Sequence, residues 1–109
     1  MKLTTAGNIQ SSNVSEEELR EAFANDRERG EFIILSQGPQ QYIQAAGEGN
    51  DPYTLEYRDG DRERHFQCTS PVTKDKVETV FIQYLKRDES WKTDFSWEKM
   101  DFRPWWKFW

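Results

Sequence analysis

The first clear hydrophobic pattern along the chain is that of an amphipathic helix with a defined start. Ser15 and Glu18 are three residues apart, which is the spacing of a capping box, where each side chain binds the backbone N–H of the other residue. The apolar residues that follow recur on one helical face: Leu19, Ala22 and Phe23. We therefore expect a helix over residues 16–29, ended by Gly30.

The segment before this helix, residues 1–13, is rich in Thr, Ser, Asn, Gly and Gln. Leu3 and Ile9 are its only apolar anchors. Polar terminal segments with so few anchors are often poorly ordered. We predict a flexible N-terminal arm over residues 1–13 and a folded domain that starts at residue 14.

The pattern changes from helix to strand after Gly30. Residues 32–35 form an apolar run that is too short for a helix, residues 37–40 form a turn, and residues 42–46 continue as a second strand. Pairing Ser36 with Gln41 places Ile34 beside Ile43 on one face of this hairpin. In this register three large side chains lie together on the second face: Ile33, Leu35 and Tyr42.

A second hairpin follows the turn-rich loop at residues 47–52. A two-residue loop at 59–60 would place Glu56 directly opposite Glu63, and like charges in that position are unfavourable. A four-residue loop at 59–62 instead pairs Glu56 with His65. It also pairs Arg58 with Glu63, Leu55 with Phe66 and Tyr53 with Cys68, which separates an apolar face from a polar one.

The strongest helical pattern begins after Thr73, which is a suitable N-cap residue. Five apolar residues recur there at helical spacing: Val77, Val80, Phe81, Tyr84 and Leu85. The helix is expected to end within residues 86–89. The remaining segment, residues 90–109, is too rich in aromatic rings for a flexible linker.

These elements together predict the fold class as α+β: a two-layer domain of helix, four-stranded antiparallel sheet and helix, with an aromatic C-terminal tail. Both helices are expected on one face of the sheet. The domain spans residues 14–109 and includes the aromatic segment 90–109. The second face, where Ile33, Leu35 and Tyr42 would lie, is one surface that the rings of the tail could cover.

Composition narrows the possible functions. The chain has 109 residues, of which 35% are hydrophobic and 15% aromatic, so we expect one domain with a small, ring-rich core. The net charge of −5 argues against a general attraction to nucleic acid. No apolar run approaches the ~20 residues that span a bilayer, and the first residues do not resemble a secretion signal. We therefore expect a cytoplasmic protein.

Few residues are suited to catalysis or metal binding. The chain has one cysteine and one histidine, so it holds no multi-cysteine or multi-histidine metal site, and we expect no metal and no cofactor. Glu56 and His65 are the only pair that resembles acid–base machinery. Cys68 lies three residues from His65 in the same strand, so the two side chains point to opposite faces. The alternative is that His65 belongs to a solvated ladder of charges with no catalytic role.

The C-terminal sequence FRPWWKFW contains the residues best suited to bind a partner: Trp105, Trp106 and Trp109. Three uses stay open: packing on the chain's own sheet beside Tyr42, a protein or subunit interface, and contact with a membrane surface. Charge is also uneven. Residues 1–61 carry twelve acidic and five basic side chains and residues 62–109 carry eight and ten, giving −7 and +2. An acidic face often meets a basic partner. The alternative is a solvated helix surface that Glu16, Glu17, Glu18 and Glu21 keep soluble.

The stretches EFIILSQ, YIQAAG, YTLEYRDG and SWKTDFSW, in this order of elements, resemble a family of small bacterial α+β domains of unknown function. That resemblance implies no activity. In size, acidity and layout the chain is also similar to small immunity proteins that neutralise secreted toxins through an acidic surface, although no residue motif of theirs is matched.

The function expected from these observations is a non-catalytic protein-binding or interaction module. Its surface would be the second face of the sheet around Tyr42, the aromatic tail, or both. Its partner would be another protein or a second copy of the chain, with no nucleic acid and no membrane span. The alternative is a small hydrolase or transferase that uses Glu56 and His65.

Overall fold

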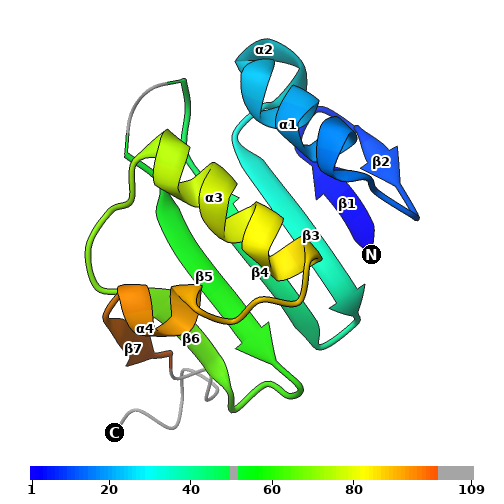
Figure 1. The fold of residues 1–109 in the computed structure, drawn as a ribbon. Coiled ribbons are helices and arrows are strands. Elements are labelled where there is room, and N and C mark those ends of the chain that lie inside the picture. Colours follow the sequence, from blue (N-terminus) through cyan, green and yellow to red (C-terminus); the bar gives the residue numbers. More distant parts are fainter. Residues whose placement is uncertain (50–51, 101–109) are drawn as a thin grey trace, which may run out of the picture.

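The computed structural model describes residues 1–49 and 52–100 (Figure 1). Within these residues the strands are β1 (Lys2–Thr5), β2 (Gln10–Ser11), β3 (Phe32–Gly38), β4 (Gln41–Ala46), β5 (Thr54–Asp59), β6 (His65–Cys68) and β7 (Trp97–Lys99). The helices are α1 (Glu16–Ala24), α2 (Asp26–Arg29), α3 (Lys74–Leu85) and α4 (Trp91–Asp94).

All strands join one antiparallel sheet in the order β2-β1-β3-β4-β5-β6-β7. The predicted α+β class is confirmed, but the sheet has seven strands in the described part of the chain instead of four. The additional strands come from both ends of the chain. Figure 1 shows α1 and α3 beside each other in front of the sheet, with β1 and β2 at one edge and β7 at the other.

The N-terminal segment is part of the sheet, so the prediction of a flexible arm over residues 1–13 is wrong. β1 lies inside the sheet beside β3, where Leu3 pairs with Leu35 and is 1% exposed. Thr5 is buried as well, and its hydroxyl accepts a hydrogen bond from the Ile9 backbone at 3.1 Å. A buried threonine and a single leucine in a four-residue strand give little hydrophobic signal, which is why the pattern resembled a loose terminus.

The first hairpin is present, but its register is one residue away from the predicted one. Leu35 pairs with Ile43 and Ser36 pairs with Tyr42, and a bulge between Ser36 and Gly38 absorbs the extra residue. A slip of one residue exchanges the faces of a strand. Ile33 and Leu35 therefore lie in the core and are fully buried, while Tyr42 lies on the opposite face of the sheet.

The first helical segment begins as predicted and then breaks. Both hydrogen bonds of the capping box between Ser15 and Glu18 are present, at 3.1 Å each. The helix is interrupted at Asn25, whose side chain accepts a hydrogen bond from the backbone of Glu28 and so caps α2. After α2 the chain reverses at Gly30, which has a φ of 77°.

The second hairpin has a longer loop than predicted. The Asp59 N–H donates to the Arg64 carbonyl at 2.9 Å, and Arg58 pairs with His65. The register therefore differs from the predicted one by two residues. Because a shift of two residues preserves the faces of a strand, Glu56, Arg58 and His65 still share the polar face.

The helix predicted after Thr73 is confirmed as α3. Its apolar stripe is buried against the sheet and α1: Val77, Val80, Phe81 and Tyr84. The rings of Phe81 and Phe23 meet edge to face, with centroids 5.2 Å apart. Beyond α3, Trp91 of α4 is 2% exposed and packs against Tyr57 with ring centroids 4.9 Å apart. Within the described residues, the aromatic segment thus contributes Trp91 to the core, and Phe95 and Trp97 pack against it.

Candidate functional site

The outer face of the sheet, opposite α1 and α3, carries the polar pair predicted from the sequence. His65 Nε2 lies 3.0 Å from Glu56 Oε1. Glu56 is directly opposite Gln67 and His65 is opposite Arg58, so the two side chains meet diagonally across β5 and β6. The second oxygen of Glu56 accepts a hydrogen bond from the Gln44 amide at 3.0 Å.

The hydrogen bonds around His65 define its proton positions. Arg58 Nε donates to His65 Nδ1 at 3.1 Å, so Nδ1 is the acceptor and the ring proton is on Nε2, where it is donated to Glu56. Both ring nitrogens are therefore bonded, and the residue is 2% exposed. An acid–base catalyst needs a ring nitrogen within reach of its substrate. This geometry gives the proposed hydrolase no support.

Tyr42, predicted as a partner-binding residue, belongs to the same cluster. Its ring meets the imidazole of His65 at a centroid distance of 6.0 Å. The guanidinium of Arg58 lies 5.5 Å from the centre of the Tyr42 ring, in the geometry of a cation–π contact. The structure thus brings Tyr42, Glu56 and His65 together. The other predicted binding residues, Trp105, Trp106 and Trp109, lie outside the described residues.

A shallow groove of about 260 Å³ adjoins this cluster on the outer face. Phe32, Ile34, Ala46, Gln44 and Glu56 line it. Phe32 is 39% exposed and is the one large apolar side chain on the surface of the described part of the chain. The groove therefore combines an exposed ring with a carboxylate.

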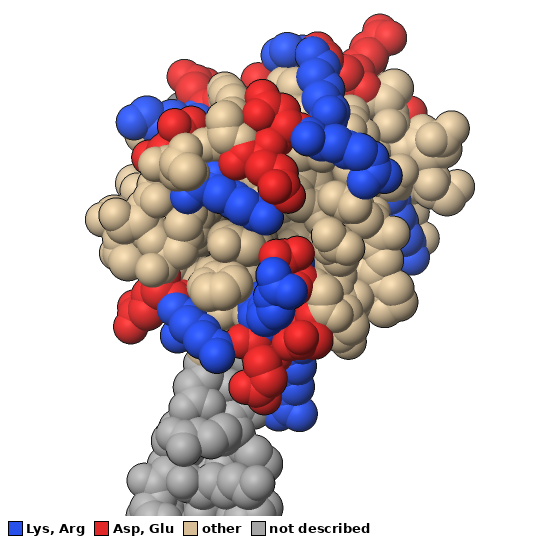
Figure 2. All heavy atoms as spheres, turned by 60° about the horizontal axis from the view of Figure 1, so that its bottom comes forward, with Lys and Arg blue, Asp and Glu red and all other residues tan. Residues whose placement is uncertain are grey.

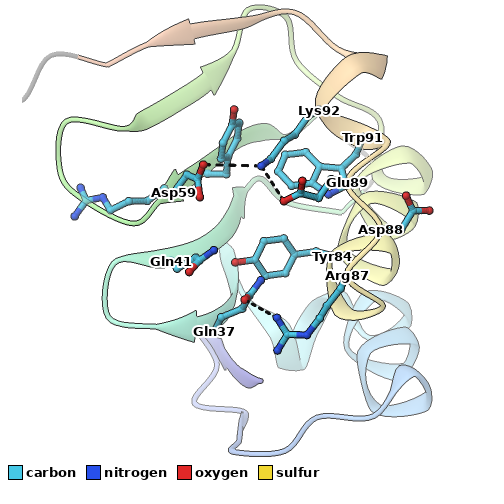
Figure 3. A pocket seen from close by; sticks show the side chains of 11 residues that line it. Gln37, Gln41, Asp59, Tyr84, Arg87, Asp88, Glu89, Trp91 and Lys92 are labelled. Carbon is cyan, nitrogen blue, oxygen red and sulfur yellow. Dashed lines mark hydrogen bonds and ion pairs between the residues drawn. The ribbon is translucent and has the colours of Figure 1, made fainter.

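A second cavity of about 160 Å³ lies where the end of α3 and the start of α4 meet the sheet (Figure 3). We call it the α3–α4 pocket. Its residues come from the ends of β3, β4 and β5 and from the connection between α3 and α4. The polar and charged side chains of its lining include Gln37, Asp59, Tyr84, Arg87, Glu89 and Lys92.

The α3–α4 pocket holds charges of both signs at separate places. Lys92 Nζ lies 3.0 Å from Glu89 Oε1 and 3.9 Å from Asp59 Oδ2. Arg87 donates to the side-chain oxygen of Gln37 at 2.8 Å. Figure 3 shows the acidic pair with Lys92 at one side of the pocket, and Arg87 with Gln37 at the other. A small molecule in the pocket would thus lie between two carboxylates and a guanidinium.

Tyr84 places a polar atom without a partner in this pocket. The side chain is 6% exposed, and its hydroxyl makes no hydrogen bond of good geometry within the described residues, although the Gln37 side chain lies close to it. Burial raises the pKa of Tyr84 to about 12, and the nearby Gln37 amide opposes this only in part. The hydroxyl is therefore protonated at physiological pH. The indole Nε1 of Trp91, which also lines the pocket, is a second buried polar atom without a partner.

The backbone at the rim of the pocket is unusual. Arg87 has a φ of 61°, the left-handed conformation that ends α3. The Arg87 N–H donates to the Tyr84 carbonyl at 3.1 Å and the Asp88 N–H to the Gln83 carbonyl at 2.9 Å, which is the Schellman arrangement. Glycine normally occupies this position. Arginine here brings a positive charge to the pocket.

Sequence reasoning missed the α3–α4 pocket. The helical spacing predicts Tyr84 as a core residue, which is confirmed, but it does not indicate that the hydroxyl lies beside a pocket. Gln37, Asp59 and Arg87 are far apart in sequence, and no short motif joins them. The sequence does contain one signal. No glycine follows the helix at residues 86–88, so a charged residue must adopt the left-handed conformation that ends it.

Within residues 1–49 and 52–100, no helix is long and apolar enough to cross a membrane. The same residues contain no group of three or more His, Cys, Asp or Glu side chains that could hold a metal ion.

No family model, curated protein or solved structure matches the chain.

Proposed function

We propose that this protein is a non-catalytic binding module that uses the outer face of its sheet to hold a protein partner. The observation that carries the proposal is the exposed ring of Phe32 in a groove next to Glu56. Aromatic side chains at the centre of an interface often contribute much of its binding energy. A ring that is 39% exposed on an otherwise well-buried chain is suited to this role.

The charge of the groove favours a basic partner. Glu56 is hydrogen-bonded to Gln44 and His65, and no Lys or Arg ion pair with Glu56 is found in the described part of the chain. A partner that presents a basic side chain beside an apolar one would therefore complement both Glu56 and Phe32. The net charge of −5 would speed its association at low salt.

The test is capture of partners from a native lysate on four immobilised chains. Phe32→Ser and Glu56→Gln change the groove, and Phe95→Ser is the control, because Phe95 is a partly buried ring at the other end of the sheet. We expect one basic protein to bind the wild type and the control, to bind the groove variants at least tenfold less, and to be released by salt. Thermal melts confirm that each variant is folded.

Two outcomes would overturn the proposal. Equal capture by all four chains would show that the groove is not the binding surface. A fifth chain without residues 101–109 is captured in parallel, and loss of binding in that chain alone would assign binding to the C-terminal rings. Sedimentation velocity tests whether the partner is a second copy of the chain. If the wild type is a dimer and Phe32→Ser is a monomer, the groove mediates self-association and the proposal of a basic partner is wrong.

A further inference from the structure

We propose that the α3–α4 pocket is a binding site for a small zwitterion of the size of a free amino acid. The carboxylate of the ligand would be held by Arg87 and the Tyr84 hydroxyl, and its ammonium group by Asp59 and Glu89. Arg58 also contacts His65 and Tyr42 on the outer face, but the site shares no residue with the groove around Phe32, so the proposal does not depend on a protein partner.

The Tyr84 hydroxyl provides the first step of the argument. A buried hydroxyl without a partner loses its hydrogen bonds to water and gains none in return. Figure 3 shows the oxygen of Tyr84 pointing toward Gln37 and Gln41, and Arg87 lies on the same side. The hydroxyl itself is fully buried, so a ligand carboxylate reaches it only by displacing a neighbouring side chain such as Gln37. It would then accept the Tyr84 proton and a second hydrogen bond from Arg87, whose guanidinium has further donors besides the one used by Gln37.

The balance of charges provides the second step. The lining contains three basic and three acidic residues: Arg58, Arg87, Lys92, Asp59, Asp88 and Glu89. Figure 2 shows basic and acidic side chains interleaved at the end of the molecule where the β3–β4 and β5–β6 turns lie, with no large patch of one sign. A simple anion or cation would meet one favourable and one unfavourable group, whereas a zwitterion meets a group of opposite charge at each end.

Lys92 orients the acidic side of the pocket. Its ammonium group lies 5.6 Å from the ring centres of both Tyr57 and Trp91, which fixes its position by cation–π contacts. From there it pairs with Glu89 and lies 3.9 Å from Asp59 Oδ2, the oxygen that also pairs with Arg64 at 2.7 Å. A carboxylate has several acceptor positions, so each can bind Lys92 and a ligand ammonium group at once.

The size of the cavity limits the ligand. On this measure one water molecule needs roughly 10–15 Å³, so a cavity of about 160 Å³ holds several water molecules or one small organic molecule. Alanine or serine fits this space, and a nucleotide does not. The aromatic walls from Tyr57, Tyr84 and Trp91 exclude water from one side of the bound molecule.

The test compares L-alanine with its two singly charged analogues by NMR titration of the labelled full chain. Propionate lacks the ammonium group of alanine, and ethylamine lacks its carboxylate. We expect alanine to bind in the millimolar range or tighter and to shift the indole N–H signal of Trp91, which is assigned from a Trp91→Phe variant. Each analogue should bind at least tenfold more weakly, because it leaves one end of the pocket unpaired.

Three variants locate the site. Tyr84→Phe removes only the hydroxyl that lacks a partner, and Arg87→Gly removes the charge while relieving the left-handed backbone. Both should stay folded and bind alanine about tenfold more weakly. Lys86→Gln is the matched control, because Lys86 is adjacent in sequence but pairs with Glu16 at 2.8 Å outside the pocket. Its affinity should equal that of the wild type.

Three results would overturn the proposal. The first is an unchanged Trp91 indole signal when alanine is added in 50-fold excess over about 1 mM protein, a concentration at which millimolar binding would be detected. The second is equal binding of propionate, which would make the pocket a site for simple anions. The third is unchanged affinity in both Tyr84→Phe and Arg87→Gly, which would place alanine elsewhere on the chain.

Discussion

The guanidinium of Arg29 donates a hydrogen bond to the hydroxyl of Tyr53, although the two residues lie 24 positions apart and both are fully buried. Arg29 also binds the carbonyls of Ala22 and Phe23 at 3.1 Å each, at the end of α1. The Tyr53 hydroxyl in turn donates to the Gly49 carbonyl at 3.0 Å. This chain of bonds joins the helical segment to the loop between β4 and β5.

Tyr53→Phe should therefore lower the free energy of unfolding by about 1.5–3 kcal/mol, the usual range for a hydrogen bond to a charged group. The ring would remain, so packing is preserved. Urea denaturation monitored by circular dichroism measures the change. Tyr42→Phe serves as the control, since Tyr42 is half-buried on the outer face and should change stability by less than about 0.5 kcal/mol. Equal effects of the two variants would contradict a special role of the Arg29–Tyr53 bond.

Phe81→Ala should cost about 3–5 kcal/mol, which is typical of a large core side chain truncated to alanine. Phe81 is fully buried and contacts Phe23 edge to face. The matched variant Phe32→Ala removes the same atoms from an exposed position and should cost less than about 1 kcal/mol. Denaturant midpoints of the two variants test this contrast, and similar midpoints would show that α3 is not part of the core.

Gly7→Ala should destabilise the fold by about 1–3 kcal/mol or more, through overpacking. A Cβ at Gly7 would lie 1.7 Å from the Glu28 carbonyl oxygen, so the turn between β1 and β2 would have to move away from α2. Gly38→Ala is the control, because a Cβ there meets no atom within 4 Å. Thermal melting compares the two. A wild-type melting temperature for Gly7→Ala would indicate that this turn does not pack on α2.

Alkaline pH should lower the free energy of unfolding of the wild type more than that of the Tyr84→Phe variant. The pKa of Tyr84 is raised from its ordinary value of 10 to about 12, chiefly because the ring is buried. The unfolded chain therefore releases this proton at a lower pH than the folded chain, so the stabilising effect is complete below pH 10 and is lost as pH rises through about 12. Urea titrations at pH 9 and pH 11 measure the difference. A constant difference between the two proteins would show that Tyr84 ionises normally.

The helices could be predicted because their signals are local. The capping box at Ser15 and the apolar stripe of α3 each lie within one segment of the chain and do not depend on distant residues. The faces of the second hairpin were also recovered, since Glu56 and His65 do contact each other. The two-residue difference in register left these faces unchanged.

The errors arose where distant contacts decide the structure. The apolar run of β3 contains no polar residue to mark its outer face. The sequence pattern therefore could not show the bulge, which places Ile33 and Ile34 on the faces opposite to those predicted. β1 is a strand only because β3 offers it a partner and α1 covers Leu3. The α3–α4 pocket combines residues from four separate segments, and its chemistry appears only once they are folded together.

The short outer strands of the sheet have a consequence for aggregation. β2 has two residues and β7 has three, and two of those in β7 are the exposed charged residues Glu98 and Lys99. Long, flat, apolar edge strands recruit further chains into growing sheets, and short or charged edges oppose this. The apolar run of β3 lies well inside the sheet, between β1 and β4. Loss of the β1–β2 hairpin by proteolysis would make β3 an edge strand. Its exposed apolar run could then pair with other chains and promote aggregation.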